Sequence, residues 1–227
     1  MNTTTTKNQN TELIKALFTN ICHDMAGVIG AINNASELIE IEDNNQCNQS
    51  NKEVKQQALN LTKKSAQNAA YRIKMFRKAY ALDDCFADTN LHDYCNDLVM
   101  FLAGKNINLI LPVDSKQRYY KAYVSRIILN MLLVLSSAIP GKESIKLQIK
   151  KHNESIFVNA ICATHNTIKI DDLIVDALMG KHSNINIKTA QAIFLHNLAN
   201  EHDCELRISA GDKALEFNAL FGQGHYS

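Results

Sequence analysis

A heptad-patterned segment that carries a histidine on its polar side decides the fold. Residues 21–34 read ICHDMAGVIGAINN, and apolar residues around them alternate three and four positions apart. This spacing is typical of a helix that packs along one seam of a bundle. The seam residues are Phe18, Ile21, Met25, Val28, Ile32, Ala35 and Ile39. His23 then occupies the heptad position that points farthest from the seam, so we expect its imidazole to face solvent or a partner.

A His-Asp pair on an outward helix face favours phosphoryl acceptance. A neutral imidazole is nucleophilic through one ring nitrogen while an acceptor holds the other. Asp24 follows His23 directly and is a candidate orienter and proton acceptor. The alternative is that His23 is a solvated surface histidine without a role. Thiol chemistry at Cys22, assisted by His23, is disfavoured because adjacent helix residues point about 100° apart.

His23 shares a helical stripe with small and polar residues. Gly27, Gly30 and Asn34 follow it at intervals of four, three and four. Each glycine costs a helix about 1 kcal/mol relative to alanine. The two glycines therefore indicate either that a partner approaches the backbone or that the neighbouring helix packs closely there. We assign Gly27, Gly30 and Asn34, together with Asn20, to partner binding.

Composition narrows the class of protein. The 227 residues carry 24 basic and 23 acidic side chains, a net charge of +1, which gives no electrostatic reason to expect nucleic acid or a membrane as partner. The six cysteines form no C-x-x-C pair, so the sequence favours a reducing cytoplasm over a zinc site or a disulfide framework. The longest apolar tract, residues 127–139, is shorter than the roughly 20 residues that span a bilayer.

The N-terminal part of the chain predicts a helical hairpin. Residues 1–10 are polar and are expected to form a disordered lead-in, and residues 11–83 form the hairpin for dimerisation and phosphotransfer. Its helices cover residues 11–41 and 52–82, with a turn near Gln46.

The second helix of this hairpin carries two apolar stripes. A second copy of the chain would cover them in a four-helix bundle. The antiparallel alignment places His23 level with residues 69–73. Arg72 is therefore expected either near an incoming phosphoryl group or as a solvated charge at the bundle edge.

Residues 84–227 predict an α/β sandwich, which makes the fold class α+β. Strands 144–151 and 155–163 alternate apolar with polar residues, as half-buried antiparallel strands do. We expect helices over residues 91–103, 119–139, 171–179 and 187–202, and further strands over residues 107–111, 205–210 and 214–220. The helix over 119–139 is apolar on nearly every side and is expected to be central.

Three segments together resemble one family. Residues 23–34, 74–80 and 128–141 are similar in order and spacing to the ChpT-type histidine phosphotransferases of alphaproteobacteria, which have a histidine-kinase-like core. The resemblance implies a homodimer that carries a phosphoryl group from the receiver domain of a hybrid histidine kinase to response regulators, through the histidine that aligns with His23. The family usually has proline where Val28 stands and a small hydroxyl residue where Gly27 stands.

The same sequence argues against an ATP-dependent kinase. A nucleotide site in that fold needs a second metal-holding asparagine four residues after Asn130, and Val134 stands there. Residues 161–166 and 180–190 also lack the glycine-rich loops that cradle phosphates. We therefore expect a degenerate ATPase-like (Bergerat-type) domain with no bound cofactor, and Mg²⁺ on the partner receiver domain. The runner-up is a non-catalytic dimeric scaffold that binds receiver domains.

Overall fold

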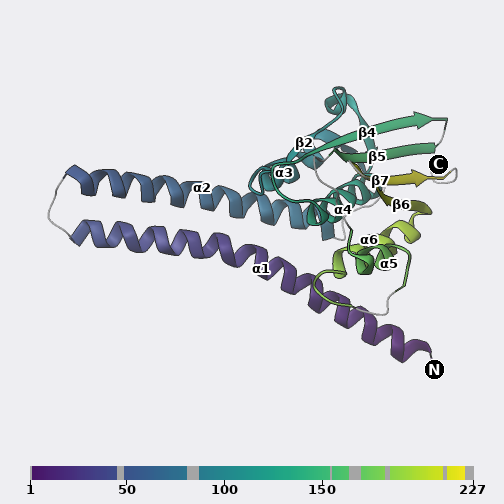
Figure 1. The fold of residues 1–227 in the computed structure, drawn as a ribbon, viewed down its shortest axis with the longest axis horizontal. Coiled ribbons are helices and arrows are strands. Elements are labelled where there is room, and N and C mark those ends of the chain that lie inside the picture. Colours follow the sequence, from purple (N-terminus) through teal and green to yellow (C-terminus); the bar gives the residue numbers. More distant parts are fainter. Residues whose placement is uncertain are drawn as a thin grey trace.

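A long helical hairpin projects from a mixed α/β domain (Figure 1). The computed structural model describes residues 2–44, 49–80, 87–153, 155–163, 170–181, 185–211 and 214–222, with side chains over 8–41 in the first helix and from 52 in the second. Helices α1 (Asn2–Asn44) and α2 (Gln49–Tyr80) form the hairpin. The predicted α+β class and the N-terminal hairpin are confirmed. The turn near Gln46 and the boundary between residues 83 and 84 lie outside the described residues.

Helix α1 is longer than its sequence predicts. Residues 2–10 are helical, although their polar composition predicts a disordered lead-in. The physical reason is that a helix already nucleated gains one hydrogen bond for each further residue that it fixes. The helix also runs without interruption through Val28, the position where the similar family usually has proline.

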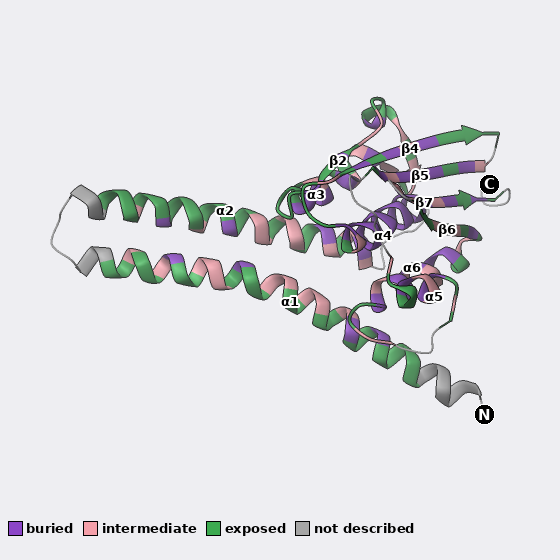
Figure 2. Ribbon diagram, in the orientation of Figure 1, coloured by how far each residue is buried: buried purple, intermediate pink, exposed green. Residues whose placement is uncertain are grey.

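The hairpin seam is only partly covered within one chain. Val28 and Ala35 are buried toward α2, whereas Phe18 is 65% exposed. Figure 2 shows that much of the hairpin surface away from the α/β domain is exposed. The large apolar residues left exposed on the two helices are Ile14, Phe18, Ile29, Leu38, Ile41, Val54, Leu59, Leu61 and Ile73.

The rest of the chain forms a sheet covered by helices. In chain order its elements are β1 (Asp88–Asn90), α3 (Leu91–Ala103), β2 (Asn108–Ile110), η1 (Ser115–Gln117), β3 (Tyr119–Lys121), α4 (Ala122–Ala138), β4 (Ser144–His152), β5 (Ser155–Ala163), α5 (Asp172–Leu178), α6 (Ala190–Glu201), β6 (Cys204–Ala210) and β7 (Ala214–Phe221). The larger sheet has the order β2-β4-β5-β7-β6 and is antiparallel except for the β2–β4 pair.

Two short strands depart from the sequence prediction. Residues 119–121 form β3 and pair antiparallel with β1, where one long helix over 119–139 was the expectation. The helix starts instead at Ala122. A strand of three residues is too short to show a period of two, and its pairing with a strand 31 residues away in sequence (Thr89 with Tyr120) is not a local property.

The core lies between one face of the large sheet and the helices. On β4, Ile145, Leu147 and Ile149 are buried, and they stand opposite Cys162, Ala160 and Val158 of β5. Residues 122–136 of α4 are all buried, which confirms that this helix is central. Among the described residues, no helix is long and apolar enough to cross a membrane.

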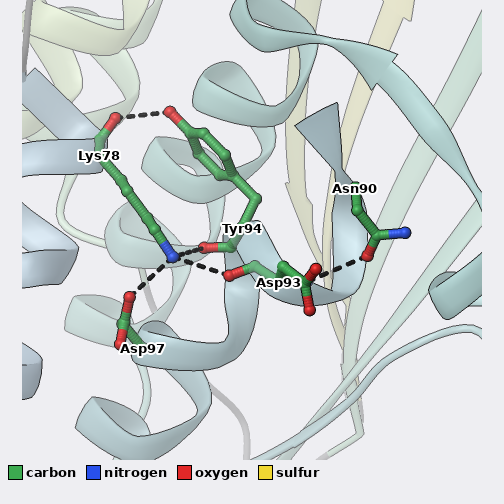
Figure 3. Close-up of polar contacts among 5 residues, drawn as sticks. All are labelled: Lys78, Asn90, Asp93, Tyr94 and Asp97. Atoms are coloured by element: carbon green, nitrogen blue, oxygen red, sulfur yellow. Dashed lines mark hydrogen bonds and ion pairs between the residues drawn. The ribbon is translucent and has the colours of Figure 1, made fainter. Parts of the chain in front are cut away.

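A polar junction fixes the end of α2 against α3 (Figure 3). The Lys78 ammonium lies 2.7 Å from an Asp97 carboxylate oxygen and donates to the carbonyls of Asp93 at 2.7 Å and Tyr94 at 3.3 Å. In return, the Tyr94 hydroxyl donates to the Lys78 carbonyl at 2.7 Å. Asn90 caps the start of α3 by accepting from the Asp93 N–H. The junction therefore orients the hairpin relative to the α/β domain.

Lys78→Met is expected to destabilise the protein by about 3 kcal/mol, because it leaves the buried Asp97 carboxylate without its cation. Urea unfolding followed by circular dichroism measures the change. Lys74→Met, at an exposed position one turn earlier, is the control and should stay within about 0.5 kcal/mol of the original chain. Equal stability of the two variants would show that the junction does not hold the domains.

Candidate functional site

His23 lies on the outside of the hairpin. Its side chain is 88% exposed, as the heptad position predicts. Nδ1 of the ring lies 3.9 Å from Oδ1 of Asp24, so Nδ1 is the ring nitrogen on the carboxylate side. This distance is longer than a hydrogen bond, and about 1 Å of movement would close it. An imidazole placed this way can be oriented through Nδ1 and can react through Nε2.

Asp24 is held by Arg72 of the opposite helix. Arg72 Nη1 donates to the Asp24 carbonyl oxygen at 2.7 Å and lies 3.9 Å from Oδ2 of the same residue. The contact confirms that this part of α1 lies level with residues 69–73 of α2. The Arg72 side chain is only 14% exposed, so it is not the solvated edge charge of the alternative interpretation.

A groove between the two helices runs beside His23. Its volume is about 380 Å³. The residues that line it are His23, Asp24, Gly27, Val28, Ala31, Ser65, Asn68 and Arg72. His23 therefore stands at the rim of a depression lined by both polar and apolar residues.

The two glycines of the stripe are not packed against any residue that the structure describes. A Cβ atom built on Gly27 or on Gly30 would meet no described atom within 4 Å. Asn34 is exposed on the same stripe. The explanation that the neighbouring helix packs closely against these glycines is therefore wrong for α2, and partner docking remains a prediction.

Asn20 is engaged inside the chain. Its side-chain amide donates to the Ile187 carbonyl at 2.7 Å, which ties α1 to the segment before α6. Beside it lies a second cleft of about 460 Å³ between the hairpin and the α/β domain. Asp24 lines this cleft as well as the groove of His23. The two depressions therefore meet at Asp24.

The buried Asn130 makes structural hydrogen bonds. Its amide nitrogen donates to the carbonyls of Ala79 at 3.2 Å and Arg126 at 2.8 Å, and its oxygen accepts from Gln191 Nε2 at 2.6 Å. Gln191 in turn accepts from the Tyr80 hydroxyl. Val134 is buried four residues later. The sequence lacks glycine-rich loops over residues 161–166 and 180–190. Of these, residues 164–166 and 182–184 lie outside the described residues.

Two residues near Asp24 had no signal in the sequence. Phe101 lies in the last turn of α3, and Lys105 lies in the turn that follows the helix. The Phe101 ring lies 5.2 Å from Arg72 Cζ and 4.5 Å from Lys105 Nζ. Neither residue belongs to a local motif, because what brings them here is the packing of α3 against α2.

Residues 106–214 match the family model described as the histidine phosphotransferase C-terminal domain. The similarity to that family therefore covers the second half of the chain up to β7. The match covers the central helix α4 and strands β2, β4, β5 and β6 of the large sheet. No curated protein sequence matches the chain.

Solved structures extend the similarity to the hairpin. A structure described as a bacterial phosphotransferase has a TM-score of 0.73 and 22% identity, over 92% of this chain and 96% of that chain. It shares the whole fold. Weaker similarities are to the catalytic domain of histidine kinase ThkA (TM-score 0.47, 11% identity, 61% of this chain and 95% of that chain) and to the histidine kinase domain of a blue-light-activated histidine kinase from Erythrobacter litoralis (TM-score 0.45, 11% identity, 89% and 95%).

Gly30→Ala is expected to stabilise the protein by about 1 kcal/mol, because the added methyl group meets no atom of the described residues and raises helix propensity. Gly30→Arg should also leave stability undiminished while it blocks a partner that docks on the stripe. Thermal unfolding and phosphoryl transfer measured on the same samples check this. A destabilised Gly30→Arg protein, or normal transfer in a stable one, would remove Gly27, Gly30 and Asn34 from the docking surface.

Proposed function

We propose that this protein is a histidine phosphotransferase of the ChpT type, a phosphorelay carrier that uses His23. It takes a phosphoryl group from the receiver domain of a hybrid histidine kinase and passes it to response regulators. The observation that carries the proposal is the exposed His23 imidazole with Nδ1 turned toward the Asp24 carboxylate. The family match of residues 106–214 supports it.

The residues of the site account for a balanced transfer step. Nε2 of neutral His23 attacks the phosphorus of the receiver's acyl phosphate, so a P–N bond forms as the P–O bond breaks. The electron pair of that P–O bond leaves with the receiver carboxylate. Nδ1 keeps its proton and directs it at Asp24, which stabilises the positive charge that the ring acquires. Mg²⁺ held by the receiver domain would neutralise the charge on the moving group.

The proposal excludes a kinase that starts the relay from ATP. Asn130, the residue that aligns with a metal ligand of nucleotide sites, has its amide engaged by Ala79, Arg126 and Gln191. Val134 offers no second ligand. The α/β domain would then serve to position the hairpin and to form part of the receiver interface. The alternative function is a non-catalytic dimeric scaffold that binds receiver domains, in which His23 accepts no phosphoryl group.

Incubation with a phosphorylated receiver domain should label the protein on His23. The label should be lost in acid and retained in base, as expected of a phosphoimidazole, and it should be absent from His23→Gln. His152→Gln, at an exposed histidine remote from the hairpin, is the control and should be labelled normally. ATP with Mg²⁺ should give no label. Binding of the receiver without labelling would favour the scaffold, and labelling by ATP would restore the kinase interpretation.

The apolar surface of the hairpin supports a homodimer. Phe18 and Ile29 are 65% and 48% exposed and lie on one face of α1. His23 lies roughly 140° around the helix from Phe18 at 100° per residue. A second copy packed on the apolar face would complete a four-helix bundle and leave both histidines outside. The unpaired thiols of Cys22, Cys95, Cys162 and Cys204 suit a reducing cytoplasm.

Light scattering should give twice 25.4 kDa at micromolar concentration. Ile29→Glu should shift the protein to monomer without unfolding it, because Ile29 is exposed within one chain. Ala26→Glu, at an exposed position off the apolar face, should leave the dimer intact. A monomeric original chain would contradict the proposed assembly.

A further inference from the structure

Two cations from different parts of the chain meet on one aromatic ring beside the site. Arg72 comes from α2, and Lys105 comes from the turn between α3 and β2. Arg72 Cζ and Lys105 Nζ lie 5.2 Å and 4.5 Å from the centroid of the Phe101 ring. Cations within about 6 Å of an aromatic centroid are attracted to the ring. Phe101 therefore holds two like charges near each other that would otherwise separate.

The pair stands next to the Asp24 carboxylate. Arg72 lines the groove of His23, Lys105 lines the cleft, and Asp24 lines both. Arg72 is committed to Asp24 through its hydrogen bond to the carbonyl oxygen. Its Nε is buried and has no hydrogen-bond partner among the described residues. One anionic and two cationic side chains give this corner a formal charge of +1.

The Lys105 ammonium is available for a ligand. In the part of the chain that the structure describes, it forms no hydrogen bond and no salt bridge. Partial desolvation of the ammonium lowers its pKa, Asp24 opposes this shift, and Arg72 adds to it. Because Lys105 is exposed and its ammonium contacts the Phe101 ring rather than a carboxylate, its charge can still bind an anion.

We propose that Lys105 is an electrostatic positioning residue for phosphoryl transfer. It stabilises the dianionic phosphoryl group as this group moves to and from His23, while Arg72 holds Asp24 in place and Phe101 holds Lys105 near it. The inference rests on the proposed function. Under this proposal the α/β domain contributes one positive charge, that of Lys105, to the phosphoryl site on the hairpin.

A small phosphoryl donor tests Lys105 without a partner protein. Phosphoramidate can phosphorylate imidazole directly: a P–N bond forms to Nε2 of His23 while the original P–N bond breaks and its nitrogen leaves as ammonia. The rate is followed by ³¹P NMR. Lys105→Met should react about tenfold more slowly than the original chain at low salt, and the difference should shrink at high salt. Lys105→Arg should restore most of the rate. Lys146→Met, an exposed lysine on the large sheet, is the matched control.

A second arm uses a phosphorylated receiver domain and separates the two claims. If the original chain takes no label on His23 from it, the proposed function fails. If the original chain is labelled and Lys105→Met reacts as fast as it does with both donors, the proposed function stands and the role of Lys105 is wrong. Lys105→Arg as slow as Lys105→Met, with both proteins folded by circular dichroism, would also overturn the role, because it would show that shape and not charge matters.

Discussion

The hydrogen bond from Arg72 to the Asp24 carbonyl joins the three segments on which the site depends. Arg72 lies on α2, its acceptor lies on α1 at 2.7 Å, and its guanidinium rests near Phe101 of α3. A planar guanidinium can donate along its edge and stack with its face, which a lysine ammonium cannot do. Because this side chain is mostly buried, the height of His23 on α1 is fixed relative to both the other helix and the α/β domain.

A second polar centre holds the α/β domain against the end of α2. Asn130 of α4 contacts the Ala79 carbonyl and Gln191 of α6, and Gln191 accepts from Tyr80. Burial raises the pKa of the Tyr80 phenol, so this hydroxyl stays a neutral donor. Every member of the chain of contacts has a partner, which is the condition under which a buried polar network stabilises a fold. Because both the nitrogen and the oxygen of the Asn130 amide are hydrogen-bonded within the chain, this side chain stabilises the fold.

Periodicity predicted the elements that are long or strongly alternating, and it did not predict contacts between them. Helix α3 over 91–103 and strand β5 over 155–163 have the predicted bounds, because each is long enough for its apolar residues to show a clear period. The exposed face of His23 was predictable for the same reason. Lys105 and the engagement of Asn20 by Ile187 were not, because each depends on how distant segments pack. The helical state of residues 2–10 was missed because it is propagated from α1 rather than encoded by strong local propensity.

Asp24 is anchored through its main chain while its carboxylate stays free to move toward His23. The strong contact with Arg72 uses the main-chain oxygen, while the carboxylate lies 3.9 Å from Arg72 Nη1 and 3.9 Å from His23 Nδ1. A carbonyl oxygen has two lone pairs, so it can accept from Arg72 and remain in the helix. Movement of the carboxylate toward the imidazole therefore does not break the bond that joins the helices. For the proposed carrier, this separates the group that orients His23 from the group that holds the hairpin, and the ring can change charge without loosening the fold.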